Sequence, residues 1–330
     1  MKYPRSRTQN IALIGLLLAI SLATRTLNLG TFLTADEKTW LGRSYEFIRA
    51  FKDVRFNDML QTTHPGVTTL WTAGIAVTTK MFVSGVPFTN ATLFHFIKSA
   101  QFSIAFLNAC AVPVIYIFLY ALLKRRDIAF FAALLIALNP LLIGYSRVVH
   151  VDALLGSLLT LAVLASMLYA RSLERQWLIA SAVLSALALL TKIPAVFILP
   201  FIVCALIVYY VIPAREPESR QSTTWIPGQA RDDIRLFLIN RFRDALIWLL
   251  IVTLMILIIW PALLWVPNPV GNVLAVKRDI SVAATTPHNM SEDYSLNPYH
   301  YPAALLSRST PVSLIGTILG LIAIAVSYKK

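Results

Sequence analysis

Two adjacent acidic residues, Asp36 and Glu37, are the first side chains in the sequence that could carry out acid–base chemistry. They follow an apolar run from Ile11 to about Leu27 and begin a long hydrophilic region. A carboxylate beside a hydroxyl group can take its proton as the oxygen attacks an electrophile. The same pair precedes an amphipathic segment, where acidic residues cap a helix and interact favourably with its dipole. From these residues alone, the pair could supply a catalytic base or cap a helix.

Three further charged residues lie between apolar runs and are candidates for a site. Arg147 occupies a short loop that the topology below places outside, where arginine is disfavoured, so it indicates an anionic partner; a pair with Asp152 or a lipid headgroup is the alternative. Asp152 directly precedes an apolar helix and either caps it or belongs to the site. Lys192 separates two apolar runs, where an ionisable group indicates function unless it reaches the headgroups.

Other motifs are weaker or missing. His64 precedes a Pro–Gly pair, and a turn alone would account for it. No HExxH, CxxC, P-loop or dinucleotide-binding pattern is present, which argues against a zinc or nucleotide site of the soluble type. Cys110 and Cys204 both lie inside apolar runs and are interpreted as packing residues.

The composition is that of a polytopic membrane protein. The chain is 57% hydrophobic and 14% charged, with a mean hydropathy of +0.69, which is more apolar than a water-soluble domain. Its net charge of +13 could suggest nucleic-acid binding. Because arginine and lysine accumulate in cytoplasmic loops of membrane proteins, topology is the better explanation, and we expect no nucleic-acid partner.

The apolar runs predict an all-α bundle of about eight transmembrane helices. The basic N-terminus could also begin a secretory signal, but an uncleaved first span gives an even count. Basic clusters then alternate onto one side, so both termini are predicted to be cytoplasmic. The predicted spans are 11–27, 99–123, 128–143, 153–170, 177–190, 195–212, 245–265 and 312–326.

Three longer connections complete a single predicted domain over residues 1–330. The first outer loop, 28–98, contains apolar residues at helical spacing from Lys38 to Phe51, which predicts an amphipathic surface helix. Within the same loop, 66–85 is interpreted as interfacial or re-entrant. Residues 213–244 are expected to form a cytoplasmic loop with little packed structure that resembles an inserted bacterial repeat element, and 266–311 a second outer loop.

Together, these residues resemble the polytopic GT-C glycosyltransferases of family 39, which includes protein O-mannosyltransferases and lipid A aminoarabinose transferases. The matching strings are short, but their order and spacing extend over most of the chain. They are Ala35-Asp36-Glu37, His64-Pro65, the run from Asn139 to Arg147 with Asp152 after it, Leu190-Thr191-Lys192 and, more weakly, the run from Asn297 to Pro302.

The resemblance implies transfer of a sugar from a polyprenyl-phosphate carrier to an acceptor, with inversion at the anomeric carbon. Asp36 would be the general base, and Glu37 would orient the acceptor or its neighbour. Cations would stabilise the negative charge that grows on the leaving phosphate. The implied phosphate-binding residues are Lys192, Arg147 and Arg308, and those implied to position substrate, or a divalent metal if one is used, are Asp152, His64 and His150.

The expected setting is the cytoplasmic (inner) membrane of a bacterium, with the active site on the outer, periplasmic side. The partners would be the polyprenyl-phosphate sugar, membrane lipids and a lipid, glycan or protein acceptor. No soluble nucleotide is needed, because the donor is already activated. A transporter or lipid flippase is the alternative from another class. A truncated, inactive copy is a further one, because relatives usually continue beyond the position of Lys330.

Overall fold

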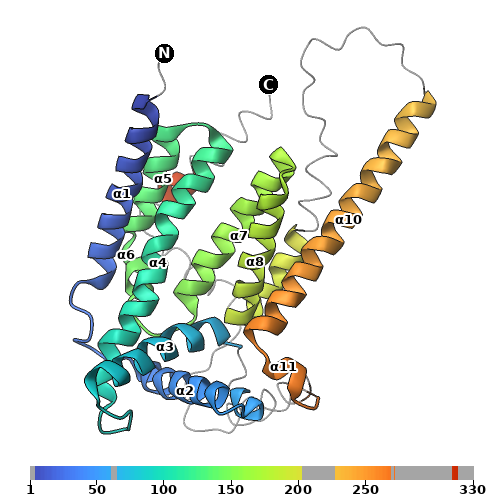
Figure 1. The fold of residues 1–330 in the computed structure, drawn as a ribbon. Helices are drawn as coiled ribbons and strands as arrows, with labels where there is room; N and C mark the ends of the chain where they lie inside the picture. The colour runs from blue at the N-terminus through green and yellow to red at the C-terminus, as the bar shows by residue number, and fades with distance from the viewer. Residues whose placement is uncertain (1–3, 61–64, 203–226, 269–270, 272–313, 319–330) are drawn as a thin grey trace, which may run out of the picture. The chain divides into compact units, whose positions relative to one another are not determined.

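The computed structural model describes residues 4–60, 65–202, 227–268, 271 and 314–318 (Figure 1). Contacts between residues divide the chain into one unit of residues 1–277 and a second of residues 278–330, and the description below concerns the first. Every regular element in its described residues is helical. The elements are α1 Pro4–Thr26, α2 Ala35–Lys52, η1 Phe56–Met59, α3 Val67–Ser84, α4 Leu93–Leu123, α5 Arg126–Leu138, α6 Pro140–Ser146, α7 Asp152–Ser172, α8 Arg175–Thr191, η2 Ile193–Phe197, α10 Pro227–Ile259 and α11 Ala262–Trp265.

The helices confirm an all-α polytopic membrane protein. Within the described part of the chain, four stretches are long and apolar enough to cross a bilayer, namely Thr8–Thr26, Leu93–Leu123, Asp152–Ser172 and Ile239–Ile259, and the bent pair α5–α6 makes a fifth. The predicted span at 177–190 corresponds to α8, which has 17 residues and is shorter than the ~20 that a bilayer requires. The predicted spans at 195–212 and 312–326 lie largely outside the described residues, so the count of eight stays a prediction.

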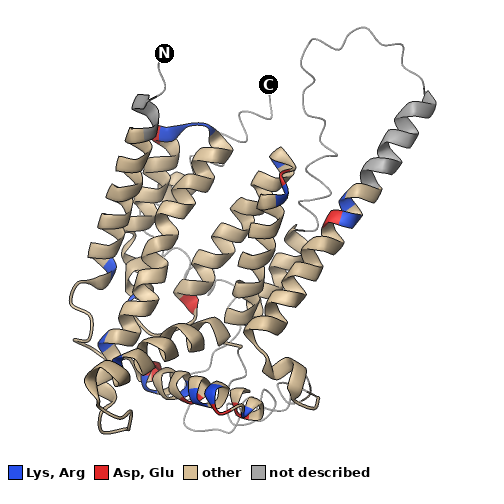
Figure 2. Cartoon of the chain, viewed as in Figure 1, with Lys and Arg blue, Asp and Glu red and all other residues tan. Residues whose placement is uncertain are grey.

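Charged residues lie toward the ends of the long helices α1, α4, α7 and α8 and leave their middles apolar (Figure 2). The α4–α5 and α7–α8 connections are at one end of these helices, and α2 and α3 lie across the other end (Figure 1). The basic clusters at 124–126 and 171–175 therefore share the end opposite α2, as the topology predicted. Which end faces the outside stays a prediction.

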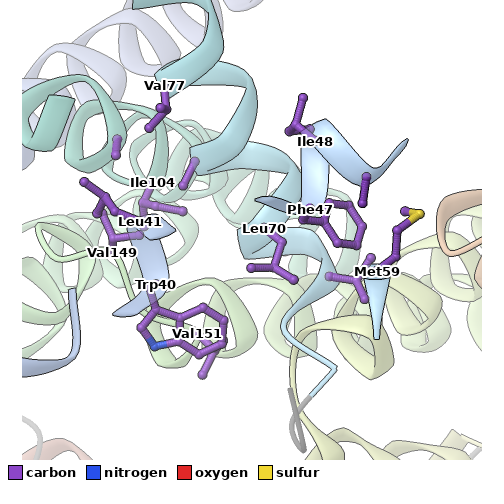
Figure 3. Close-up of a cluster of buried hydrophobic side chains, with 14 of the residues drawn as sticks. Trp40, Leu41, Phe47, Ile48, Met59, Leu70, Val77, Ile104, Val149 and Val151 are labelled. Carbon is purple, nitrogen blue, oxygen red and sulfur yellow. The ribbon is translucent and has the colours of Figure 1, made fainter. Parts of the chain in front are cut away.

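The helix predicted in the first loop forms as α2, and it packs against protein as well as facing solvent. Glu46 and Arg49 are exposed, whereas Trp40, Leu41 and Phe47 are buried. These apolar side chains meet others from α3, α4 and the 149–151 segment in one cluster (Figure 3). Burial of large apolar side chains of this kind is the main source of packing energy.

The second helix of this layer, α3, covers the predicted interfacial stretch and does not qualify as a membrane span. It lies closely against α2 at Gly74, where an added Cβ atom would be 2.4 Å from the carbonyl oxygen of Ser44. Only glycine permits this approach. We conclude that α2 and α3 form a packed platform at one end of the helices.

Two arginines fasten α1 to the bent pair α5–α6. The pair bends by 58° at Asn139-Pro140, where the Asn139 side chain accepts hydrogen bonds from the N–H groups of Leu141 and Leu142. Arg25, only 2% exposed, donates to the last α5 carbonyls, Ala137 at 3.0 Å and Ile136 at 3.2 Å.

In return, Arg147, which directly follows α6, donates to the carbonyl oxygens at the end of α1. The Nη2 atom of Arg147 lies 2.6 Å from the carbonyl oxygen of Leu27 and 3.3 Å from the carbonyl oxygen of Asn28. Carbonyl groups at helix ends lack partners within the helix, and a cation there also interacts favourably with the helix dipole. The two arginines thus position the segment that leads from α6 to Asp152.

The expectation for residues 213–244 requires a correction from residue 227 onward, whereas 213–226 lie outside the described residues. Little packed structure was expected there, but a continuous helix, α10, begins at Pro227 and runs to Ile259. The sequence from Ile234 to Ile239 is apolar apart from Arg235, which a helix accommodates, and proline is favoured at a first helical position. The mixed charges concealed this pattern.

We predict that Arg25→Met lowers the free energy of unfolding by about 1–3 kcal/mol, because buried α5 carbonyl groups lose their donors. Thermal unfolding of the purified protein in detergent would measure the loss. Arg49→Met is the control, since its side chain is 55% exposed. Equal unfolding midpoints for the two variants would contradict the fastening role of Arg25.

Candidate functional site

Glu37 is the central residue of the site and is fully buried, with 0% exposure. One carboxylate oxygen, Oε2, accepts hydrogen bonds from the backbone N–H of Thr34 at 2.8 Å and from its hydroxyl at 3.1 Å. The other, Oε1, accepts from the side-chain amide of Gln101 at 2.9 Å and from the backbone N–H of Val149 at 2.8 Å. Four donors therefore hold this carboxylate in one orientation.

Gln101 extends this network from α4 to the end of the α1–α2 connection. Its amide nitrogen also donates to the carbonyl oxygen of Phe32 at 3.2 Å, and its amide oxygen accepts from the N–H of Gly30 at 2.7 Å. Gly30 has a φ of +81°, a conformation that glycine adopts without strain. Both the oxygen and the nitrogen of the Gln101 amide thus hold the loop that leads into α2 and Asp36.

Asp36 differs from Glu37 in both burial and hydrogen bonding. Its side chain is exposed, and among the described residues it has no hydrogen bond or ion pair. It lies in the first turn of α2, four residues before Trp40, so both project from one face of the helix. The burial of Glu37 fixes the helix, and the carboxylate of Asp36 is left free for chemistry.

His150, Asp152 and Lys192 come together beside this helix face. The Lys192 ammonium lies 2.7 Å from Oδ1 of Asp152, and Nδ1 of His150 lies 3.3 Å from Oδ2. The ring of His150 contacts the ring of Trp40 edge to face, with 6.0 Å between the ring centroids. Asp152 therefore uses both oxygens to orient a lysine and a histidine, and the contact with Trp40 connects the cluster to the helix of Asp36.

The end of the first loop reaches the same cluster. The N–H of Gly66 donates to the carbonyl oxygen of Thr191 at 3.1 Å, and the hydroxyl groups of Thr68 and Thr191 are hydrogen-bonded to each other. Lys192 follows in an extended conformation between α8 and η2. The Lys192 side chain is 24% exposed, so it is shielded from bulk water without being sealed off.

The remaining predicted site residues are not part of this cluster or cannot be placed. Arg147 contacts the end of α1, and its contacts in the structure include neither Asp152 nor another acid. His64 and Arg308 lie outside the described residues, as does the weak fifth motif. Among the side chains that the structure describes, no group of three or more acidic, histidine or cysteine residues is placed to hold a metal. The predicted roles of Arg147, His64 and Arg308 stay predictions.

Two cavities adjoin the cluster. One of about 310 Å³ lies between α1, α4, α5 and α7 and is lined by polar residues that include Asp152, Arg25 and Asn108. A larger one of about 640 Å³ is mainly apolar, with walls from α3, α4, α7, α8 and α10. Thr68, which bonds to Thr191, lines the larger cavity, and Ser157 lines both. Asp152 of the charged cluster therefore lines the smaller cavity, and the larger, apolar cavity reaches Thr68, the partner of the residue that precedes Lys192.

The sequence prediction missed two residues that hold the site in place, Gln101 and Arg25. Both lie inside apolar runs, and polar or ionisable side chains in such runs are candidates for a specific role. That signal was present in the sequence. Trp40 was assigned to the apolar face of the surface helix, and no sequence pattern indicates that it would contact a histidine more than 100 residues away.

Comparison with known proteins agrees with the resemblance. Residues 85–228 match the dolichyl-phosphate-mannose-protein mannosyltransferase family. The matched region contains Asp152 and Lys192 but begins after Asp36 and Glu37. No curated protein and no solved structure matches the chain. The resemblance to family 39 glycosyltransferases is thereby confirmed, and the roles of individual residues stay predictions.

We predict that Glu37→Gln destabilises the protein by about 2–4 kcal/mol. Both oxygens of Glu37 accept hydrogen bonds, so the NH₂ group of glutamine would face other donors in either orientation of its amide. Rotating the Gln101 amide would not help, since its nitrogen would then face the N–H of Gly30. Thermal unfolding in detergent measures the change. Asp36→Asn is the matched control and is expected to shift stability by less than about 0.5 kcal/mol. Equal destabilisation of the two variants would show that Glu37 has no special structural role.

Proposed function

We propose that the chain is an inverting glycosyltransferase that moves a sugar from a polyprenyl-phosphate carrier to an acceptor hydroxyl group at one membrane surface. The family match indicates a membrane glycosyltransferase of the mannosyltransferase type. The sugar, the lipid, glycan or protein nature of the acceptor, and an outer location of the site belong to the proposal.

The observation that carries the proposal is the convergence of separate motifs. Glu37 and Val149 are 112 residues apart in sequence and share a hydrogen bond. Lys192 and Asp152 are 40 residues apart and form an ion pair. The contact between Trp40 and His150 joins the two groups. A carboxylate that has no partner among the described residues and a cation near an apolar cavity are the two elements that transfer from a lipid phosphate requires.

The proposed reaction uses Asp36 as the general base. The acceptor oxygen attacks the anomeric carbon and forms the new glycosidic bond, while its proton moves to the Asp36 carboxylate. The bond from the anomeric carbon to the phosphate oxygen breaks with its electron pair, so the carrier leaves as a lipid phosphate. Attack from the face opposite the leaving group inverts the configuration. The exposure of Asp36 gives a hydroxyl group access to it.

Lys192 would stabilise the charge that develops on the leaving phosphate. A lysine ammonium has three hydrogen-bond donors, and only one is directed at Asp152 in the structure. Two donors remain for phosphate oxygens, and the Asp152 pair keeps the side chain from extending into water. Since the phosphate gains charge as the bond breaks, this cation would lower the energy of the transition state more than that of the bound donor.

The apolar cavity supports a lipid-linked donor. Its lining is dominated by side chains such as Leu107, Leu158, Leu187 and Ile259, which match a hydrocarbon chain. At its Thr68 side it reaches the residues that precede Lys192. A polyprenyl chain bound there would bring its phosphate to the ammonium, because chain and phosphate are covalently joined.

We predict that Asp36→Asn abolishes transfer without reducing membrane abundance, because it removes the base and no stabilising contact. The measurement is mass spectrometry of surface glycolipids and glycans from cells lacking the gene, complemented with wild type or variant. Asp53→Asn is the matched control, since this carboxylate is exposed at the other end of α2. Restoration of the same sugar by Asp36→Asn would exclude Asp36 as the base, and failure of the wild type to change any sugar would count against glycosyl transfer.

Lys192→Met is predicted to raise the KM for the lipid donor and to lower kcat by roughly 10²-fold or more, the scale at which single charge-stabilising donors act. Lys192→Arg keeps the charge and should retain part of the activity. Transfer would be assayed in membranes with the sugar and acceptor identified by the first experiment. Unchanged donor kinetics in Lys192→Met, with normal thermal stability, would rule out the phosphate-binding role.

A further inference from the structure

A second apolar groove lies between α3 and α4, apart from the proposed catalytic cluster. It has a volume of about 710 Å³ and is lined by one face of each helix, together with residues at the end of α1. The lining residues of α3 recur from Thr72 to Val83, and those of α4 from Lys98 to Leu107, each at the three- and four-residue spacing of a helix face. None of the residues assigned to catalysis or phosphate binding lines it.

Among the described residues that line this groove, two are charged, Lys80 and Lys98. Lys80 is half-buried and Lys98 is exposed. Within the described part of the chain, neither ammonium has a hydrogen bond or an ion pair. The hydroxyl groups of Thr79 and Ser99 lie beside the lysines in sequence, line the same groove and donate no hydrogen bond to a described residue. The groove thus offers positive charge and hydrogen-bond donors that the described protein does not use.

The order of residues along α4 matches the order of groups in a lipid. Lys98 lies in the second turn of α4, a candidate membrane span, so it is near one membrane surface. The apolar residues follow further into the span: the rings of Phe102 and Phe106 stack at 5.9 Å and are 49% and 42% exposed. Leu107 continues this face at 40% exposed. A cation at headgroup depth with exposed apolar side chains beneath it complements an anionic head joined to hydrocarbon tails.

We propose that this groove binds one anionic membrane phospholipid, with its phosphate on Lys80 and Lys98 and its acyl chains along Phe102, Phe106 and Leu107. An exposed apolar surface of this size marks an interaction site, and the two lysines specify the charge of the occupant. The groove adjoins the proposed carrier cavity only at Thr72 and Leu107, which line both. The site is therefore separate from the one that would hold the donor, and it does not depend on the proposed function.

The experiment is native mass spectrometry of the purified full-length protein in detergent. Equal amounts of phosphatidylglycerol and phosphatidylcholine with the same acyl chains are added, and the lipids that remain bound are counted. Wild type is expected to retain one phosphatidylglycerol in preference to phosphatidylcholine. The double variant Lys80→Gln/Lys98→Gln should bind it about tenfold more weakly, because each lysine contributes to attraction of an anionic lipid.

Two variants control for charge and for fold. Lys38→Gln/Lys124→Gln removes the same net charge from two exposed lysines outside the groove and should keep wild-type binding. Lys80→Arg/Lys98→Arg preserves both cations and should also keep it. Equal retention of phosphatidylglycerol by the groove variant and wild type would overturn the proposal. So would equal binding of the two lipids by wild type, or displacement of the bound lipid by one equivalent of polyprenyl phosphate, which would assign the groove to the carrier.

Discussion

The site depends on the carboxylate of Glu37, which is buried and accepts hydrogen bonds from three separate parts of the chain. A buried charge is unfavourable unless donors surround it, and here four donors replace the water that it loses. Because those donors come from the first loop, from α4 and from the segment before α7, satisfying one carboxylate requires all three to be in place. The same charge thus sets the positions of the loop that leads to Asp36 and of the His150–Asp152 segment.

A similar requirement acts on the backbone around the site. The bend at Asn139-Pro140 interrupts a pair of helices that would otherwise form one span, and carbonyl groups at a helix end need donors where water is scarce. Arg25 supplies them for α5, and Arg147 supplies them for α1. Arg147 was predicted to bind an anion, and the structure shows that partial negative charge on backbone carbonyls also accounts for an arginine there. The two explanations are compatible, since only one of its terminal nitrogens makes these contacts.

Apolar runs and helical periodicity were enough to predict the all-α membrane fold and the helix from Lys38 to Phe51, because these follow from local patterns. The interfacial nature of 66–85 stays a prediction. The resemblance to the family was also accessible, since it rests on short strings in a fixed order. The partners of Glu37 were not. Gln101 and Val149 are distant in sequence, and nothing local to either indicates which acid it will meet. The helix from Pro227 was missed because mixed charges concealed its pattern.

Adjacent residues on a helix point about 100° apart, so Asp36 and Glu37 cannot share one environment. If Glu37 faces the donors of α4 and the 149 segment, Asp36 points in another direction, and its side chain is exposed. A base that accepts a proton from a substrate must not already be saturated with protein donors, and Glu37 is saturated. The assignment of Asp36 as the base therefore follows from the burial of its neighbour as much as from its own position. An exchange of the two residue types would leave a shorter side chain to reach Gln101 and Val149, and the network that orients the helix would fail.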